Sequence, residues 1–412
     1  MPAIAANLPE ELVPITDAVE AFCRAEVIAR HERHHDLLND PRNTYGADGR
    51  MVAAAVDQIR AVRMASAKAG FFNVSVPKSL GGSEMGMIAY YTLIEAVYRL
   101  CGPHNWLCDF VISHWAFGPS AVLTAITDKA RERILPGMMA GELMMCFGMS
   151  EPDAGSDAAM LKTRATPNGS GGWTINGRKI WTTHIPIADY CIVFAQTDPE
   201  RAAQKKGGIS AFLVPTSAPG LNVESVIRMH GHIGGHEGIT FFDDVEVEAW
   251  QLVGELHEGF KIGLLGVSMG RIYNSARAVG LARWALEMAI GYAQQRQAFG
   301  HPISEYQGVS FPLADAATEI HAAHLMGINV AQLLDRGERA VKELSMAKSY
   351  SVQAAARAVD RAIQTHGAMG FTNELGLHEA YARVRQANVA DGTNEILART
   401  ISQRLFKGDL EL

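Results

Sequence analysis

Asp391 is a carboxylate whose neighbours allow two different roles. It stands in VADGTNEI, Val389–Ile396, directly before Gly392, and a glycine lets another molecule approach the backbone closely. Burial raises the pKa of a carboxylate toward neutrality and makes it a better general base. The competing interpretation is that Asp391 caps the helix that begins near GTNEI, because aspartate is a favoured N-cap residue. These residues alone leave both roles open.

A second set of chemically capable residues lies in two earlier segments. They are CFGMSEPDAGSD, Cys146–Asp157, and TINGRKIWTTH, Thr174–His184. A protein that holds a flavin must supply hydrogen bonds to the ring edge, an apolar wall beside the ring, and donors for the pyrophosphate. The candidates for these three tasks, in that order, are Met149 and Ser150, Trp181 with Thr183, and Gly155 with Ser156. No GxGxxG motif follows a predicted strand, so a Rossmann-type dinucleotide site is not predicted.

These segments, together with others nearer the C-terminus, resemble the acyl-CoA dehydrogenase family of flavoproteins. FGMSEPDAGSD is similar to the family pattern YxxTEPxAGSD, and INGRKIWTTH is similar to INGxKxWITN. The family pattern RxxFGxxxxxxQ is matched by Arg296, Phe299, Gly300 and Gln307. QTHGAMGF, Gln364–Phe371, and VADGTNEI match two further motifs.

The resemblance implies FAD as the cofactor and assigns contacts to it. Contacts within the same subunit are implied for Phe147, Met149, Ser150, Gly155, Ser156, Trp181 and Thr183. Contacts to a neighbouring subunit's FAD are implied for Arg296, Phe299, Gln307, Gln364 and Gly367, with Thr393 and Glu395 closing over the adenine pyrophosphate. Arginine suits a pyrophosphate because its guanidinium presents a charged fork to phosphate oxygens.

The implied activity is that of an oxidoreductase of fatty acid metabolism, which dehydrogenates an acyl-CoA thioester to a 2-enoyl-CoA. In this chemistry a carboxylate removes the α proton while a hydride leaves the β carbon for the flavin. Asp391 matches the base, although most members carry glutamate there. Some members place the base on an earlier helix, where this chain has Gly270. The implied substrate contacts are Ser156, Arg271 and Gly392.

The departures from the common pattern resemble one branch of the family. Ala390 replaces a bulky aromatic residue before the base, and GVSMGRIYNSAR and HIGGHEGITF are similar to the branch that includes enzymes acting on 4-hydroxyacyl-CoAs. Ala390 and Gly270 would leave room for a branched, hydroxylated or bulky acyl group.

Two other functions stay open. Nitroalkane oxidase resembles this family and also uses aspartate, so a flavin oxidase of the same fold is the first alternative. A non-catalytic assembly protein is the second, and it would be expected to lack the base or the flavin residues. The implied partners of the dehydrogenase are an electron-transferring flavoprotein and further copies of the chain, in a homodimer or homotetramer.

The predicted fold class is α+β, with the order helical, β, helical that the resemblance also implies. The expected parts are an N-terminal helical domain over 1–143, a middle β-barrel-like domain over 144–252, and a C-terminal four-helix bundle over 253–412. Asn176-Gly177 predicts a two-residue hairpin between antiparallel strands. Pro136 is expected to break a helix that Thr127 caps.

Composition excludes several classes of protein. The 412 residues include 48% hydrophobic and 20% charged residues, which is ordinary for a globular enzyme. A net charge of −7 argues against general nucleic-acid binding. The odd number of cysteines, five without a CxxC pair, favours reduced thiols in the cytoplasm. Neither a signal peptide nor a membrane span is predicted.

Three histidines in HGHIGGH invite a metal interpretation. They are His230, His232 and His236. The segment offers no clear fourth ligand and its glycines are typical of a turn, so we predict no metal.

Overall fold

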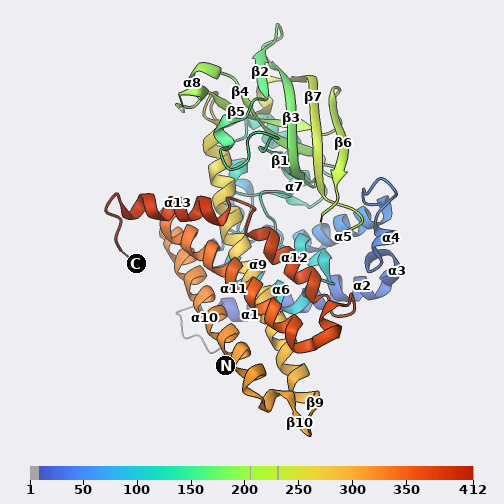
Figure 1. Cartoon of the computed structure of the whole chain (residues 1–412). Coiled ribbons are helices and arrows are strands. Elements are labelled where there is room, and N and C mark those ends of the chain that lie inside the picture. The colour runs from blue at the N-terminus through green and yellow to red at the C-terminus, as the bar shows by residue number, and fades with distance from the viewer. Residues whose placement is uncertain (1–8, 205, 230–231, 412) are drawn as a thin grey trace. The chain divides into compact units, whose positions relative to one another are not determined.

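The computed structural model describes residues 9–204, 206–229 and 232–411 and divides them into two compact units (Figure 1). One unit, here called the helical unit, comprises Met1–Arg30, Met85–Asp109 and Arg271–Leu412. The other, the sheet unit, comprises His31–Glu84 and Phe110–Gly270. The predicted order of helical, β and helical segments is confirmed. The three-domain division at residues 143 and 252 stays a prediction.

The helical unit is built from long helices that pack side by side. α10 packs against α6 and α11, and α11 packs against α12 and α13, as a bundle requires. Small residues face the contacts: a Cβ atom on Gly327 of α10 would lie 2.2 Å from the Tyr91 ring of α6. The helices are α1 (Leu12–Phe22), the π-helical η1 (Cys23–Ile28), α6 (Gly86–Cys101), α9 (Gly259–Gln295), α10 (Gln307–Asp335), α11 (Val341–His366), α12 (Leu377–Ala387) and α13 (Asn394–Leu405).

The sheet unit holds eight strands among its described residues. Seven follow the order β6-β7-β3-β2-β4-β5-β8, and β1 pairs with β4. The strands are β1 (Met145–Gly148), β2 (Arg164–Pro167), β3 (Trp173–Thr183), β4 (Tyr190–Gln196), β5 (Ile209–Pro215), β6 (Leu221–Ile227), β7 (Glu237–Val247) and β8 (Leu252–Val253). Two pairings, β1 with β4 and β2 with β4, are parallel, so the sheet is mixed.

The sheet unit also contains helices. They are α3 (His35–Leu38), α4 (Pro41–Thr44), α5 (Ala53–Ala69), α7 (Asp128–Met139) and α8 (Pro199–Ala203), while α2 (Ala29–Arg33) spans the division between the units. α9 also crosses the division, at Gly270, and its first turns belong to the sheet unit. There a Cβ atom on Gly266 would lie 2.2 Å from the buried Trp115 ring, so glycine permits this close packing.

The hairpin predicted at Asn176-Gly177 was wrong. β3 runs through both residues without turning, and its register against β7 shifts between Ile175 and Gly177, as at a β-bulge. Gly177 is needed for close approach rather than for a turn, because a Cβ atom there would lie 2.4 Å from the Thr163 hydroxyl oxygen. Asn176 instead joins the two strands through its side-chain bonds to Asp244.

A two-residue hairpin does occur in the helical unit, at Phe299-Gly300. It joins β9 (Gln297–Ala298) to β10 (His301–Pro302), and both turn residues have positive φ angles, 51° and 88°. Such angles match a type I′ turn, which seldom carries an aromatic residue. The Phe299 side chain is 95% exposed.

Pro136 does not break its helix. α7 continues to Met139, and Pro136 lies inside it, so this expectation was wrong. The Thr127 cap is confirmed, since its hydroxyl accepts the Ala130 N–H at 3.2 Å. All five cysteines are buried free thiols. Within the described part of the chain, no helix combines the length and apolar character that crossing a membrane requires.

Candidate functional site

Asp391 occupies a strained turn between α12 and α13. Its φ angle is +53°, and that of Gly392 is +96°, so two consecutive residues are left-handed. Aspartate tolerates this conformation better than most residues do, yet it still costs about 1–3 kcal/mol and needs support from its surroundings. The residue as a whole is half-buried.

Four polar side chains from two helices support this turn. Asn274 of α9 donates to Asp391 Oδ2 at 2.7 Å, and Arg271 Nε donates to the Asp391 carbonyl oxygen at 3.0 Å. Lys348 of α11 donates to the Gly392 carbonyl oxygen, also at 3.0 Å. Arg277 adds a further positive charge near the carboxylate. Backbone and side chain of the turn are therefore fixed separately.

Burial raises the pKa of Asp391 to about 6, while the charges of Lys348, Arg271 and Arg277 and the bond from Asn274 oppose that rise. A carboxylate with this pKa is mostly ionised at neutral pH and is a stronger base than an exposed one. Burial also lowers the pKa of Lys348 to about 8. The lysine thus still carries its charge across the range in which Asp391 titrates.

The capping role considered for Asp391 falls to another residue. Thr393 is the N-cap of α13, and its hydroxyl accepts the Ile396 N–H. Glu395 follows in the first turn, where a negative charge suits the helix dipole. Asp391 thus does not cap α13.

In the sheet unit, the loop after β1 is anchored to β3 at several points. The Ile180 N–H donates to the Ser150 carbonyl oxygen at 3.0 Å, and Lys179 Nζ donates to that of Met149 at 3.2 Å. The structure therefore brings the two segments that contain Met149, Ser150, Trp181 and Thr183 side by side.

A buried ion pair strengthens this anchor. Lys179 Nζ lies 2.7 Å from Glu151 Oε1, and both side chains are almost wholly buried. Glu151 also accepts the Lys162 and Thr163 N–H groups and the Thr163 hydroxyl. These donors hold the pKa of Glu151 below its usual value against the effect of burial. The carboxylate thus organises the loop.

The residues predicted to hold FAD in this unit leave accessible surface suited to it. Trp181 is 52% exposed at a φ angle of +62°, so an aromatic face is held out from β3. Gly155 and Ser156 are exposed, and no atom lies within 4 Å of where a Cβ atom on Gly155 would stand. Exposed large aromatic residues in a strained conformation indicate a ligand surface. These features fit a flavin with its pyrophosphate.

Two members of the predicted FAD set have mainly packing contacts. Phe147 stacks on Trp115, with ring centroids 3.6 Å apart. Met149 is buried, and a Cβ atom on Gly263 would lie 2.2 Å from its terminal methyl carbon. Their side chains shape the floor beneath the loop, so any direct contact to FAD from Met149 falls to its backbone.

The residues predicted to contact a neighbouring subunit's FAD, here called the Arg296 group, lie in the helical unit near the C-terminal ends of α9 and α11. Arg296 and Gln307 are exposed near the Phe299 hairpin, and Gln364 and Gly367 are exposed at the end of α11. These two segments are joined by the stacking of Tyr292 on His366, with ring centroids 4.6 Å apart, which links the ends of α9 and α11.

The Arg296 group lies far from Asp391 in the same chain. Asn274, which contacts Asp391, and Gln295, which ends α9, are separated by 21 residues of continuous helix. At a rise of 1.5 Å per residue, that separation is about 32 Å. One chain therefore holds the candidate base beside the middle of α9 and the Arg296 group beside its C-terminal end.

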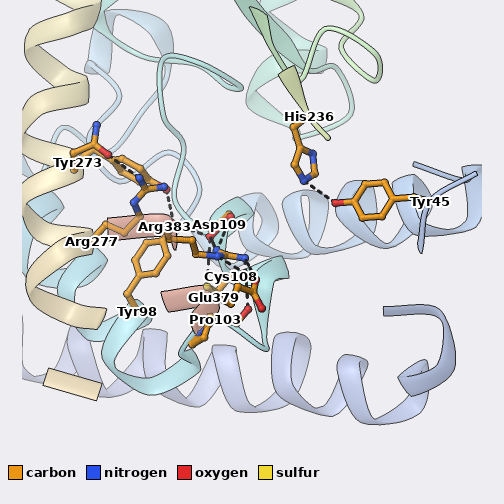
Figure 2. A network of polar contacts seen from close by, with 11 residues as sticks. Tyr45, Tyr98, Pro103, Cys108, Asp109, His236, Tyr273, Arg277, Glu379 and Arg383 are labelled. Atoms are coloured by element: carbon orange, nitrogen blue, oxygen red, sulfur yellow. Dashed lines mark hydrogen bonds and ion pairs between the residues drawn. The ribbon is translucent and has the colours of Figure 1, made fainter. Parts of the chain in front are cut away.

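The predicted histidine segment gives no metal site within the described residues. His236 forms a 3.1 Å bond with the Tyr45 hydroxyl (Figure 2), and its ring lies 5.2 Å from that of His184. No group of three potential ligand side chains is found in the part of the chain that the structure describes. His230 lies outside the described residues.

Sequence reasoning missed Asn274, Lys348, Lys179 and Glu151. Asn274 and Lys348 are 117 and 43 residues from Asp391 in sequence. Asn274 stands within GVSMGRIYNSAR, but nothing in that segment indicates a contact with Asp391. The signal for Lys179 and Glu151 was present, since both stand within the quoted motifs, but a buried pair is visible only once the strands are placed.

Three domain families of acyl-CoA dehydrogenases match successive parts of the chain. Their N-terminal domain matches residues 9–142, their middle domain matches 146–245, and their C-terminal domain matches 257–406.

Individual proteins are similar over 83–97% of the chain. The probable acyl-CoA dehydrogenase YngJ of Bacillus subtilis is 32% identical, over 97% of this chain and 99% of its own. Human mitochondrial short-chain specific acyl-CoA dehydrogenase is 33% identical, over 91% and 90%. The CarC subunit of the caffeyl-CoA reductase-Etf complex of Acetobacterium woodii is 32% identical, over 83% and 88%.

Solved structures share the fold. Butyryl-CoA dehydrogenase of Megasphaera elsdenii is 26% identical, covers 98% of this chain and 100% of its own, and has a TM-score of 0.82. The FAD complex of PigA is 26% identical over 98% and 99%, with a TM-score of 0.83. The predicted fold is thereby confirmed.

Replacing Lys179 by methionine tests the anchor of the loop. The change leaves Glu151 buried without its cation, so we expect unfolding to be easier by about 3 kcal/mol and FAD to be retained poorly. Lys162→Met is the matched control, because Lys162 pairs with Asp153 where both side chains are more than 70% exposed. It should leave stability nearly unchanged, because an exposed ion pair is screened by solvent. Chemical denaturation and flavin absorbance after gel filtration measure both effects. Equal stability of the two variants would contradict the assigned role.

Proposed function

This chain belongs to the acyl-CoA dehydrogenase family, and we propose that Asp391 is the base that removes the α proton of its substrate. The protein is an FAD-dependent oxidoreductase that acts on acyl-CoA. The observation that carries the proposal is the carboxylate of the half-buried residue Asp391, whose pKa is raised to about 6 in a turn supported from two helices.

The proposed reaction places demands on the residues around Asp391. The α proton of a thioester is too weakly acidic for a carboxylate in water, so the site must stabilise the developing charge on the thioester oxygen and exclude water. We assign the backbone N–H of Asp391 to that oxygen, with Gly392 allowing the close approach. Bound FAD supplies the acceptor for the hydride that leaves the β carbon. The Asp391 carboxylate receives the α proton.

We place the substrate among acyl-CoAs with a hydroxylated, branched or ring-bearing chain. The support is sequence-based: Ala390 stands where most members carry a bulky aromatic residue, and Gly270 removes a second side chain. The name of one relative, a caffeyl-CoA reductase subunit, also points to a ring-bearing acyl group for that protein.

We also propose that further copies of the chain and an electron-transferring flavoprotein complete the system. The separation of Asp391 from the Arg296 group along α9 supports a site that draws on two subunits. The relative from Acetobacterium woodii is a subunit of an Etf complex by name, which supports the second partner. A flavin oxidase of the same fold remains the alternative that uses aspartate, and dioxygen consumption separates the two.

Flavin reduction by a panel of acyl-CoAs tests the substrate class and the base together. Anaerobic addition of butyryl-, isobutyryl-, 3-phenylpropionyl- and 4-hydroxybutyryl-CoA to the FAD-loaded protein should bleach the flavin absorbance with at least one thioester. Asp391→Asn should slow that bleaching by a factor on the order of 10²–10⁴, because the amide cannot accept the proton. Reduction by a nitroalkane, with no thioester effective, would move the protein to the oxidase class. FAD content of the variant serves as the control.

The second prediction follows from the pKa of Asp391. The carboxylate acts only when ionised, so the rate of flavin reduction should rise about tenfold per pH unit below pH 6 and level off above it. Stopped-flow absorbance between pH 5 and 8 measures the curve. A rate independent of pH across this range would argue against Asp391 as the base.

The third prediction tests whether two subunits share a site. Arg296→Ala and Asp391→Asn should each inactivate a homo-oligomer. Co-expression of the two variants should restore activity, because one site in each mixed pair receives an intact Asp391 from one chain and an intact Arg296 from the other. Differently tagged chains allow the mixed oligomer to be isolated and assayed. Absence of complementation in a verified mixed oligomer would place both residues at the same chain's FAD.

A further inference from the structure

Asn274 forms hydrogen bonds both to the cation Arg277 and to the candidate base Asp391. Its Nδ2 donates to Asp391 Oδ2 at 2.7 Å, and its Oδ1 accepts from Arg277 NH2 at 2.8 Å. The asparagine is 4% exposed, so water does not compete strongly for either group. The three residues form a short chain of hydrogen bonds that ends on the carboxylate.

The direction of this chain is fixed by chemistry. A guanidinium has only donors, so Arg277 must face the amide oxygen of Asn274. The amide NH2 group is then forced to face Asp391, where it can only donate. A donor aimed at a carboxylate favours the ionised form, which is the form that a base requires.

Arg277 is itself held in place by aromatic and acidic neighbours (Figure 2). Its guanidinium lies 5.4 Å from the centroid of the Tyr273 ring. The Tyr273 hydroxyl bonds that of Tyr98, which donates to Asp109 at 2.7 Å. Asp109 also pairs with Arg383 of α12 at 3.3 Å. The orientation of Arg277 is thereby tied to three helices of the same unit, α6, α9 and α12.

Only one oxygen of the carboxylate is engaged. Oδ2 accepts from Asn274, whereas the described residues offer no hydrogen-bond donor to Oδ1. Side-chain rotation would exchange the two oxygens, and the bond from Asn274 opposes that rotation. Asp391 is shorter than the usual glutamate, so its reach depends more strongly on which oxygen is presented.

We propose that Asn274, oriented by Arg277, is the positioning residue of the base: it anchors Oδ2 of Asp391 and presents Oδ1 to the α proton. The proposal rests on the assignment of Asp391 as the base. Both Asn274 and Arg277 lie in GVSMGRIYNSAR, but the sequence alone assigned neither of them a role.

The ionisable groups that face Asp391 within the helical unit do not change their protonation state while Asp391 titrates. They are Arg271 and Arg277 of α9, Lys348 of α11 and the neutral Tyr90 of α6, with Glu395 of α13 acting on Lys348. A change in the pKa of Asp391 after substitution of Asn274 therefore reports on the lost bond.

The test uses Asn274→Leu and Asn274→Asp in the full-length, FAD-loaded protein. Leucine removes the donor at similar volume, and we expect the proton affinity of Asp391 to rise about tenfold. Aspartate keeps the shape but places a second carboxylate beside Oδ2, and it should raise that affinity further. Ser275→Ala is the matched control, because Ser275 is buried on the same helix and bonds Ser351 instead.

Two readouts separate this proposal from the assignment of the base. Potentiometric proton-binding curves, each subtracted from that of the same protein carrying Asp391→Asn, give the pKa of Asp391 without any substrate. The pH dependence of flavin reduction by the most effective thioester of the panel gives the kinetic value. We expect both to shift upward together in the two Asn274 variants, with KM little changed and Ser275→Ala unaffected.

Unshifted curves in correctly folded Asn274 variants would overturn the positioning role, and loss of reduction in Asp391→Asn would then still support the base. Normal reduction in Asp391→Asn would overturn both. The isosteric Asn274→Asp provides the comparison if the leucine variant does not fold.

Discussion

Burying a carboxylate without neutralising it is the constraint on which the arrangement of the helical unit depends. Asp391 lies at +53° in φ on a turn that α13 alone could not maintain. Arg271 and Lys348 bind the carbonyl oxygens of Asp391 and Gly392, so the backbone is fixed by cations that also favour the ionised side chain. The same groups thus compensate both the conformational strain and the cost of burial.

Helix α9 extends this constraint over a long distance. Its middle carries Arg271 and Asn274 beside the turn, and its C-terminal end leads to the Phe299 hairpin. A continuous helix is stiff, so residues several turns apart on it keep a separation that a loop could not maintain. Helix α9 therefore fixes the distance between the exposed Phe299 and Asp391, both of which have positive φ angles. This spacing gives physical content to the proposal that two chains complete each FAD site.

The sequence predicted the order of helical and β segments well, because helical and strand periodicity are local signals. It failed at Asn176-Gly177, where the glycine serves close packing against Thr163 rather than a turn. It also passed over Phe299-Gly300, since phenylalanine is a poor residue for a left-handed turn. Asn274 could not be found at all, because its role depends on a contact across 117 residues.

The choice of aspartate over the family's usual glutamate follows from the backbone of this turn. Aspartate is enriched at positive φ among residues with a side chain, whereas a longer side chain gains no local bond there. Its short side chain also reaches Asn274 at 2.7 Å without leaving the turn. The aspartate is thus explained by the support around it, independently of substrate size. If Asp391 is the base as proposed, Ala390 is the neighbouring residue that bears on the shape of the acyl group.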